Sequence, residues 1–278
     1  LNDIHITTTS TNINDSSIGK SGYGGAIYVA GSENVISNIE IDDSKALAVR
    51  MNAKGGAIYW EGSYGTLINA SISNSLANGE GGAIYWKGAS ATFENISIEY
   101  SQTNVTGSNS ADGGAIYSTS IDNMNNVYII NALASTDSGD VHGGAIYCNG
   151  VNLNNVTVIG SRAATDDGKS YGGAIYWVSG GQGYLINSTF ERNTANYGGA
   201  ICNLRTINVD GTSFIGNVAI EGGAIYCQNA VILTDSTFEL NSAKRGGAVY
   251  VQKFNLQIDG STLRNNTAEE KGGAIYYV

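Results

Sequence analysis

Short apolar segments recur along this chain in a fixed order, and within each segment apolar and polar positions alternate. The most regular segment follows the tetrapeptide Gly-Gly-Ala-Ile, which occurs ten times, one-residue variants included. The first glycines of the ten copies are Gly24, Gly55, Gly81, Gly113, Gly143, Gly172, Gly198, Gly222, Gly246 and Gly272. A repeat with steps of this length indicates a solenoid, a propeller or a repeat array.

Two further apolar segments accompany each Gly-Gly. One carries alternating pairs such as Val151 and Leu153, or Ile207 and Val209. The other has the form Ser/Thr-Ser/Thr-Phe/Leu-x-x-Asn at residues 188–193, 212–217, 236–241 and 261–266. Period-two segments bounded by Gly, Asn, Asp or Ser are typical of short strands.

Three short strands in a unit of ~24 residues are the plan of one rung of a parallel β-helix. Propeller blades need four antiparallel strands in ~40–45 residues, so the units are too short for them. We therefore expect a right-handed parallel β-helix of about ten rungs, each with three short strands. At a spacing of roughly 4.8 Å per rung, the rod would be on the order of 50 Å long.

The tyrosines after the Gly-Gly-Ala-Ile copies are expected to face outward. Successive side chains of a strand point to opposite faces, so Ile and the following Tyr must separate. Burying a column of phenols with few partners would cost about 1–3 kcal/mol each. The column consists of Tyr28, Tyr59, Tyr85, Tyr117, Tyr147, Tyr176, Tyr226, Tyr250 and Tyr276, with Cys202 in its one gap.

Composition is consistent with one β-helical domain over residues 1–278. The chain has no proline, 38 glycines and a net charge of −10, which disfavours nucleic-acid binding. It has no apolar run long enough for a transmembrane helix. The three cysteines, Cys148, Cys202 and Cys227, are expected to be free. Because the first and last rungs are incomplete, we expect a piece of a longer array, or end-to-end assembly of copies.

Three consecutive connections before a Gly-Gly are long and rich in aspartate, at residues 104–112, 135–142 and 164–171. Insertions at one corner of successive rungs should stack into a binding edge. Its candidate residues are Asp112, Asp137, Asp140, His142, Asp166 and Asp167. Such oxygens suit calcium, but no spacing matches an established calcium loop and aspartate also favours solvated turns. We therefore predict no required cofactor and keep calcium as a hypothesis.

Catalysis and carbohydrate binding remain alternatives. Arg162 with Asp166 and Asp167 is the nearest approach to a lyase or hydrolase cluster, because glycoside hydrolysis needs two opposed carboxylates. Trp60, Trp86 and Trp177 directly follow the tyrosine column. They could serve as platforms for sugar rings, or pack against neighbouring rungs.

Asn-x-Ser/Thr sequons mark candidate glycosylation sites in an exported chain. They occur at Asn14, Asn69, Asn95, Asn104, Asn155, Asn187 and Asn265. The alternative is chance, since Asn, Ser and Thr are abundant in this sequence.

Iterated Gly-Gly-Ala-Ile paired with Phe-x-x-Asn resembles the passenger region of the polymorphic outer-membrane proteins, and is similar in plan to archaeal adhesin-like surface proteins. Full Phe-x-x-Asn occurs at residues 190–193, 214–217 and 238–241. The resemblance implies a surface-displayed β-helix used for adhesion or as a structural element. We therefore expect a non-enzymatic extracellular protein, adhesin-like or filament-forming. Its expected partners are further copies of itself or other cell-surface molecules and glycans.

Overall fold

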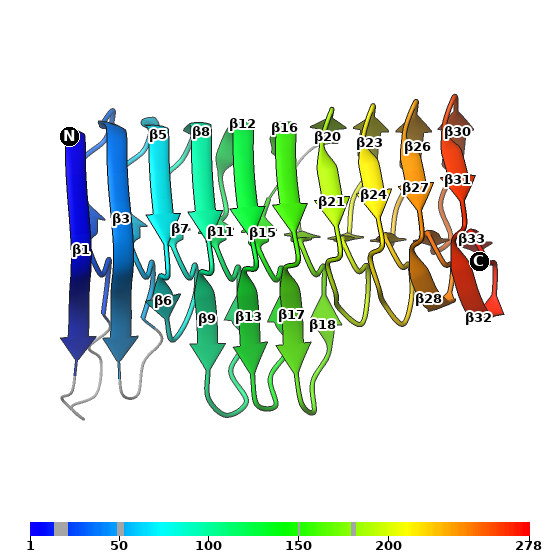
Figure 1. The fold of residues 1–278 in the computed structure, drawn as a ribbon, viewed down its shortest axis with the longest axis horizontal. Helices are drawn as coiled ribbons and strands as arrows, with labels where there is room; N and C mark the ends of the chain where they lie inside the picture. Colours follow the sequence, from blue (N-terminus) through cyan, green and yellow to red (C-terminus); the bar gives the residue numbers. More distant parts are fainter. Residues whose placement is uncertain (14–21, 49–52, 150, 179–181) are drawn as a thin grey trace.

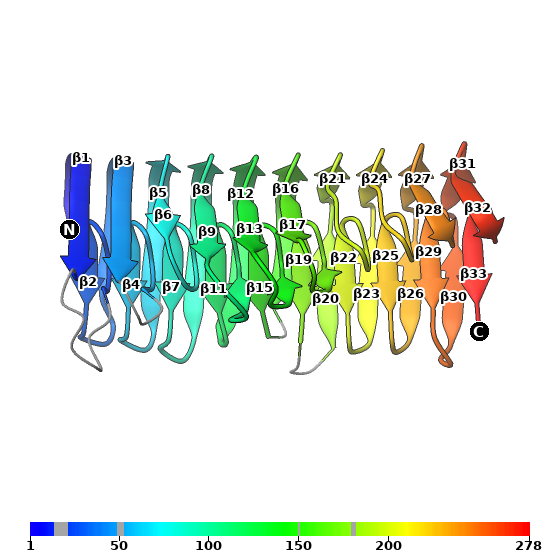
Figure 2. The same ribbon diagram turned by 90° about the horizontal axis from the view of Figure 1, so that it is seen from below.

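The chain forms one continuous coil of parallel strands. The computed structural model describes residues 1–13, 22–48, 53–149, 151–178 and 182–278, and every regular element within them is a β-strand. Figures 1 and 2 show a rod with the two termini at opposite ends. Each strand pairs in parallel with its equivalents in the neighbouring rungs. The predicted right-handed parallel β-helix is confirmed.

The first strand of each rung follows the Gly-Gly-Ala segment, and ten such strands form one sheet, so the rod has ten rungs. These strands are β2 (Ile27–Val29), β4 (Ile58–Trp60), β7 (Ile84–Trp86), β11 (Ile116–Ser118), β15 (Ile146–Cys148), β19 (Ile175–Trp177), β22 (Ile201–Asn203), β25 (Ile225–Cys227), β29 (Val249–Val251) and β33 (Ile275–Tyr277).

The second and third strands belong to a larger sheet that bends between them. In the first half of the rod they form single bent elements: β1 (Asn2–Ile13), β3 (Val35–Ala48), β5 (Gly65–Ser73), β8 (Ala91–Glu99), β12 (Ile121–Ile130) and β16 (Asn152–Ile159). In the second half they separate into β20 (Gly183–Ile186), β21 (Thr189–Glu191), β23 (Ile207–Asp210), β24 (Ser213–Ile215), β26 (Val231–Thr234), β27 (Thr237–Glu239), β30 (Leu256–Asp259) and β31 (Thr262–Arg264).

A short fourth strand precedes the next Gly-Gly in several rungs, which the sequence did not predict. Among the described residues, the ends of β1 and β3 and six separate strands occupy this place: β6 (Leu76–Ala77), β9 (Gln102–Val105), β13 (Leu133–Thr136), β17 (Arg162–Thr165), β28 (Ser242–Arg245) and β32 (Thr267–Lys271). Apart from alanine, few positions in these segments are apolar. Their hydrophobic pattern is therefore too weak to distinguish a strand from a loop.

The two glycines of each Gly-Gly corner are required for different reasons. The first has φ between 59° and 71° in all ten copies, a left-handed conformation that favours glycine. The second lies against two other backbones. A Cβ on Gly82 would stand 2.0 Å from the carbonyl oxygen of Gly114 and 2.5 Å from the carbonyl carbon of Gln102. No side chain fits there, so the corner explains why the glycine pair recurs in every copy.

The core runs the length of the rod, and the isoleucine of each Gly-Gly-Ala-Ile points into it, as predicted. Ile58, Ile84 and Ile116 are fully buried in the main core cluster. The third residue of each first strand also faces inward. Where this residue is large, the residue that faces it across the core is small. Where this residue is a tryptophan, the facing position is glycine or alanine: a Cβ on Gly65 would lie 2.3 Å from the Trp86 ring.

This packing contradicts the sugar-platform hypothesis for the tryptophans. Trp60, Trp86 and Trp177 are buried in the core, and the Trp60 and Trp86 ring centroids lie 4.6 Å apart. Trp86 donates its indole N–H to the carbonyl of Gly88. A sugar cannot reach these rings, so the proposed binding role of Trp60 and Trp86 is wrong and the packing alternative holds.

The Phe-x-x-Asn segments build two adjoining stacks inside the last rungs. Phe190, Phe214 and Phe238 stack face to face, with ring centroids 5.3 and 4.6 Å apart. Beside them, Asn193, Asn217, Asn241 and Asn266 form a ladder, here called the buried asparagine ladder.

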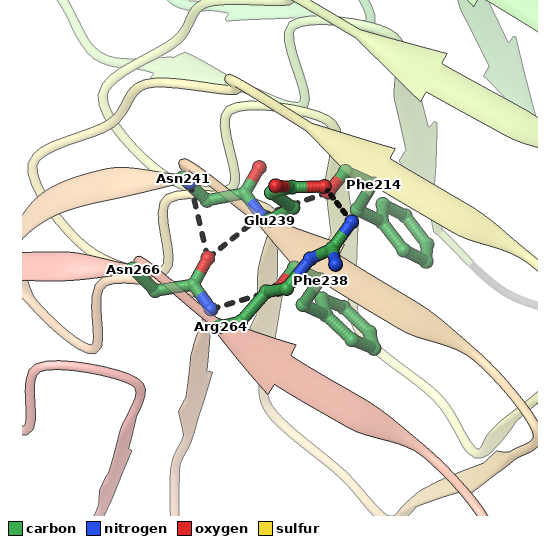
Figure 3. A network of polar contacts seen from close by, with 6 residues as sticks. All are labelled: Phe214, Phe238, Glu239, Asn241, Arg264 and Asn266. Carbon is green, nitrogen blue, oxygen red and sulfur yellow. Dashed lines mark hydrogen bonds and ion pairs between the residues drawn. The ribbon is translucent and has the colours of Figure 1, made fainter.

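The amides of Asn193, Asn217 and Asn241 are each tied to both neighbouring rungs. The Asn217 amide nitrogen donates to Asn241 Oδ1 at 3.0 Å and to the Phe190 carbonyl at 2.9 Å. Figure 3 shows the same arrangement for Asn241 and Asn266 around Phe214 and Phe238. On the outside of the same rungs, Arg264 pairs with Glu239 at 2.6 Å. Full hydrogen bonding is the condition on which such polar groups can be buried.

Truncating the phenylalanine stack should destabilise several rungs. Phe214→Ala removes a fully buried ring and is expected to lower the free energy of unfolding by about 3–5 kcal/mol. Phe214→Leu is the matched control, because Leu263 occupies the same column, and should lose less than half of that. Chemical denaturation measures both. A loss for Phe214→Ala below about 1 kcal/mol would contradict the inward packing.

Placing a carboxylate in the buried asparagine ladder should make stability depend on pH. Asn217→Asp puts a carboxyl where only hydrogen-bonded amides lie, and burial should raise its pKa above the unfolded value of about 3.9. The free energy of unfolding of Asn217→Asp should therefore be nearest to that of the wild type at pH 4. It should fall as the pH rises and lie about 3 kcal/mol below the wild-type value at pH 7. Asn217→Ser, which mimics Ser161 in the same column, should show a loss that does not change with pH. Equal losses for Asn217→Asp at both pH values would refute the burial of this position.

Candidate functional site

Three consecutive rungs extend beyond the rungs on either side of them at one edge of the rod. The extension of each rung consists of a fourth strand, a tip and a short returning strand. These are β9 with β10 (Ala111–Asp112), β13 with β14 (Val141–His142), and β17 with β18 (Ser170–Tyr171). We call this part of the surface the extended edge; Figure 1 shows it projecting below the rod. The predicted stacking of the three long connections is confirmed, although much of their length is strand.

The extended edge has a small core of its own. Val105, Ala111, Ala134, Val141 and Ala163 form a buried cluster separate from the main core. The chain thus packs each extension against the next, as it packs whole rungs.

Backbone and carboxylate hydrogen bonds order the tips. Asp137 accepts a hydrogen bond from the Gly107 amide on one carboxylate oxygen at 2.9 Å. Its carbonyl accepts bonds from the amides of Asp166 and Asp167 in the next rung. Asp140 likewise accepts from the Lys169 amide at 2.9 Å. The aspartates therefore have a structural role, in addition to any role in binding.

A shallow groove of about 180 Å³ lies along the exposed face of the extended edge. Its lining includes Asn104, Ser135, Asp137, Arg162 and Asp166. The structure thus brings Arg162 together with carboxylates of two rungs, as the sequence suggested for Asp166. Asp137, Arg162 and Asp166 are exposed, so their charges are solvated. This surface can bind polar partners through hydrogen bonds and charge.

Asp112 and His142 lie at the base of the extended edge, at the ends of its returning strands, and not at the tips where a loop-edge partner would bind. Both directly precede a Gly-Gly, where the chain has already returned to the body of the rod. Asp112 Oδ1 lies 2.7 Å from His142 Nδ1, and both side chains are largely buried. The His142 ring stacks on Tyr171 with centroids 5.4 Å apart. The pair stabilises neighbouring rungs rather than facing a ligand at the tips.

The residues before each Gly-Gly form a second column that sequence reasoning missed, here called the pre-glycine column. Its members pair rung to rung in the order Tyr23, Lys54, Glu80, Asp112, His142, Tyr171, Tyr197, Glu221, Arg245 and Lys271. Lys54 and Glu80 pair at 2.9 Å, and Arg245 pairs with Glu221. Aligning the ten copies at the glycines would have revealed these pairs of opposite charge.

The tyrosine column lies on the outer face of the first-strand sheet, as predicted. Tyr59, Tyr85 and Tyr117 stack with ring centroids 4.9 to 5.1 Å apart. At Cys202 the stack is interrupted, and rings of the pre-glycine column bridge the interruption. Tyr176 contacts Tyr171 at 5.8 Å, Tyr171 contacts Tyr197 at 5.1 Å, and Tyr197 contacts Tyr226 at 5.3 Å. An almost continuous series of rings therefore covers this face.

Covering the rings shifts the acid–base equilibrium of their phenols. Partial burial raises the pKa of Tyr147, of Tyr171 and of Tyr226 to about 12. Nearby carboxylates, Asp112 beside Tyr147 and Asp140 beside Tyr171, contribute to the same rise in pKa because they disfavour a phenolate.

The three cysteines are free, as predicted, and all three are buried. Cys148 and Cys227 lie in the main core, whereas Cys202 packs among the tyrosines on the other face of its sheet. Burial raises the pKa of the Cys227 thiol to about 11, and raises those of Cys148 and Cys202 further. Thiols held in the neutral form are poor nucleophiles, so these residues are suited to packing.

Four of the sequons have a structural origin. Asn69, Asn95, Asn155 and Asn187 lie in one column, each with φ near 50° at the bend between the second and third strands. Asparagine tolerates this left-handed conformation better than most residues. The residue two positions later faces outward on the third strand, a position that a small polar Ser or Thr can occupy. Asn104 and Asn265 are exposed outside this column, and Asn14 lies outside the described residues. Glycosylation stays a prediction.

Among the residues that the structure describes, no three His, Cys, Asp or Glu side chains lie where they could share a metal ion. The calcium hypothesis for Asp137, Asp140, Asp166 and Asp167 therefore gains no support from the geometry and stays untested. In the same described part of the chain, we find no helix of the length and apolar character needed to span a membrane.

Comparison with known proteins identifies the repeat. Three segments, residues 187–204, 211–228 and 260–277, match the Chlamydia polymorphic membrane protein repeat. Each begins at the bend before a third strand, and ends within or just after the following first strand. Each thus spans the asparagine of the buried ladder and the Gly-Gly corner. Neither a curated protein nor a solved structure matches the chain. The chain therefore carries repeats of this family, as the resemblance indicated.

The tyrosine surface predicts how the fold responds to alkali. The pKa of Tyr147 and of Tyr226 is about 12 in the folded protein, compared with 10.0 for an unperturbed tyrosine such as one in the unfolded chain. Folding therefore favours the neutral phenol. The resulting stability should be intact below pH 10 and be lost as the pH rises from 10 to 12. Absorbance at 295 nm should show a tyrosinate step near pH 12 that Tyr147→Phe reduces. Ionisation of all tyrosines near pH 10, with the strand signal in circular dichroism unchanged, would contradict this.

Proposed function

We propose that this chain is a non-enzymatic β-helical rod displayed at the cell surface, with an adhesin-like role. The observation that carries the proposal is the distribution of variation among the rungs. The Gly-Gly corners, the isoleucine column and the buried asparagine ladder repeat, whereas three consecutive rungs carry added residues that stack at the extended edge. A scaffold that varies at one edge is typical of solenoid proteins that bind partners.

The family repeat supports the location. The matched repeat is named for a membrane protein of Chlamydia, and surface display is consistent with the acidic, proline-free composition. The proposed partners are other cell-surface molecules, glycans included, or further copies of the chain arranged end to end. Display as a filament and glycosylation of the exposed sequons belong to the same proposal.

A polysaccharide-active enzyme is the second candidate, because the groove of the extended edge combines Arg162 with Asp137 and Asp166. Incubating the chain with neutral and acidic polysaccharides, and measuring new reducing ends or unsaturated products, tests it. We expect no turnover. Turnover that is abolished by Asp166→Asn would replace the adhesin proposal with the enzyme.

Removing the extended edge should abolish adhesion without unfolding the rod. Ala195-Asn196-Tyr197 is the short connection at the same place in a rung without an extension, because Tyr197 pairs with Tyr171 in the pre-glycine column. In the shortened variant, a single asparagine therefore replaces each of the segments 104–111, 135–141 and 164–170. Beads coated with this variant should bind cells about tenfold less than wild-type beads, a loss near 1.4 kcal/mol.

The control for this experiment is Lys244→Asn, an exposed change in a short rung of the same edge. It should leave adhesion unchanged, and circular dichroism should show intact strands in both variants. Equal adhesion of wild-type and shortened chains would show that the extended edge is not the binding surface. Failure of wild-type beads to bind any cell type would overturn the adhesin role itself.

A further inference from the structure

A second polar ladder runs along the outside of the rod, at the bend between the second and third strands. Asn69 donates to Asn38 Oδ1 at 2.8 Å, Asn95 to Asn69 Oδ1 at 3.0 Å, and Asn126 to Asn95 Oδ1 at 2.9 Å. Asn155 continues the series to Asn126 at 2.8 Å. We call this series the exposed asparagine ladder. Unlike the buried ladder, it presents its amides to solvent.

The amides of the exposed ladder have hydrogen-bonding capacity beyond the bonds between rungs. A primary amide has two N–H donors and an oxygen with two lone pairs. In the described structure, Asn95 donates one N–H to Asn69 and accepts one bond from Asn126. One donor and one acceptor of Asn95 thus remain for a ligand, at a spacing of roughly 4.8 Å from the equivalent groups of Asn69.

A hollow of about 480 Å³ lies beside this ladder on the outer surface of β5, β8 and β12. Its polar and aromatic lining consists of Asn69, Asn95, Asn126, Ser71, Ser97 and Tyr128. None of the lining residues carries a charge.

Tyr128 interrupts an otherwise regular column. The outward position of the third strand is serine or threonine in most rungs: Ser71, Ser97, Thr157, Thr189, Ser213, Thr237 and Thr262. Tyr128 pairs with Ser97 on one side and with Thr157 on the other, and 39% of it is exposed. The ring borders the hollow, so one aromatic face meets a row of amides and hydroxyls.

We infer that this hollow binds a neutral, extended glycan that lies along the rod axis. The apolar C–H face of a pyranose would pack on the Tyr128 ring, and its hydroxyls would exchange hydrogen bonds with Asn69, Asn95, Ser71 and Ser97. The rung spacing is close to the length of one sugar unit in an extended chain, so successive units meet equivalent groups. Glu94, which accepts a bond from Asn126 at 2.9 Å, lies beside the ladder and disfavours acidic sugars.

This inference rests on the proposed surface role and deepens it by naming a ligand class and a face distinct from the extended edge. Because Asn69 and Asn95 are sequons, the test uses protein made without N-glycosylation. Binding to an array of neutral and acidic oligosaccharides comes first. Calorimetry with the best neutral oligosaccharide then compares the wild type with two variants that copy residues from the same columns.

Tyr128→Thr reproduces Thr157 of the next rung and removes the ring; it should weaken binding about tenfold or more. Asn95→Gly reproduces Gly211, which has φ of 56° in the same column, and should weaken binding less. Tyr184→Asn is the control. Tyr184 is an exposed tyrosine between Asn152 and Asn208 that lies outside the hollow, and its replacement should change nothing.

Three outcomes would overturn the inference: no neutral glycan bound, a preference for acidic glycans, or undiminished affinity of Tyr128→Thr. The two proposals fail separately. If the purified chain binds neutral glycans through Tyr128 but wild-type beads bind no cell, the adhesin role fails and the glycan site stands. If beads adhere through the extended edge and Tyr128→Thr has no effect on glycan binding, the glycan site alone fails.

Discussion

The close approach of three backbones at each Gly-Gly corner is the constraint on which the rest of the rod depends. At Gly82, the missing Cβ would lie 2.0 Å from the next rung and 2.5 Å from the fourth-strand segment of its own rung. This contact closes the coil around a narrow core. The isoleucine column, the tryptophans matched by glycine or alanine, and the phenylalanine stack all have the sizes that this cross-section allows.

The two asparagine ladders lie at different bends of the rungs, and their amides have different hydrogen-bonding roles. Inside, Asn193, Asn217 and Asn241 satisfy buried carbonyls and one another, and so join rungs through the core side of a bend. Outside, Asn69 and Asn95 hold the left-handed conformation of another bend and leave part of their hydrogen-bonding capacity exposed. The same residue type thus gives cohesion in one column and a recognition surface in the other.

Because every rung is paired with its neighbours independently of its tips, the rod tolerates added residues at one edge. The extended edge has its own small core and hydrogen bonds, and the rungs beneath it keep their register. Added residues can therefore change without cost to the Gly-Gly corners. This separation favours a role as a binding scaffold, because the residues of the extended edge can vary while the pairing of the rungs is unchanged.

The sequence by itself determined the period, the strand class, the number of rungs and the direction of the isoleucine and tyrosine columns, because strand periodicity and glycine spacing are local properties. Only the tertiary structure decided where the side chains of different rungs meet. Asp112 and His142 belong to the pre-glycine column rather than to the loop tips, and Trp60 and Trp86 lie in the core facing small residues. The register of the stack sets these contacts, and a register relates residues some thirty positions apart, which no local pattern records.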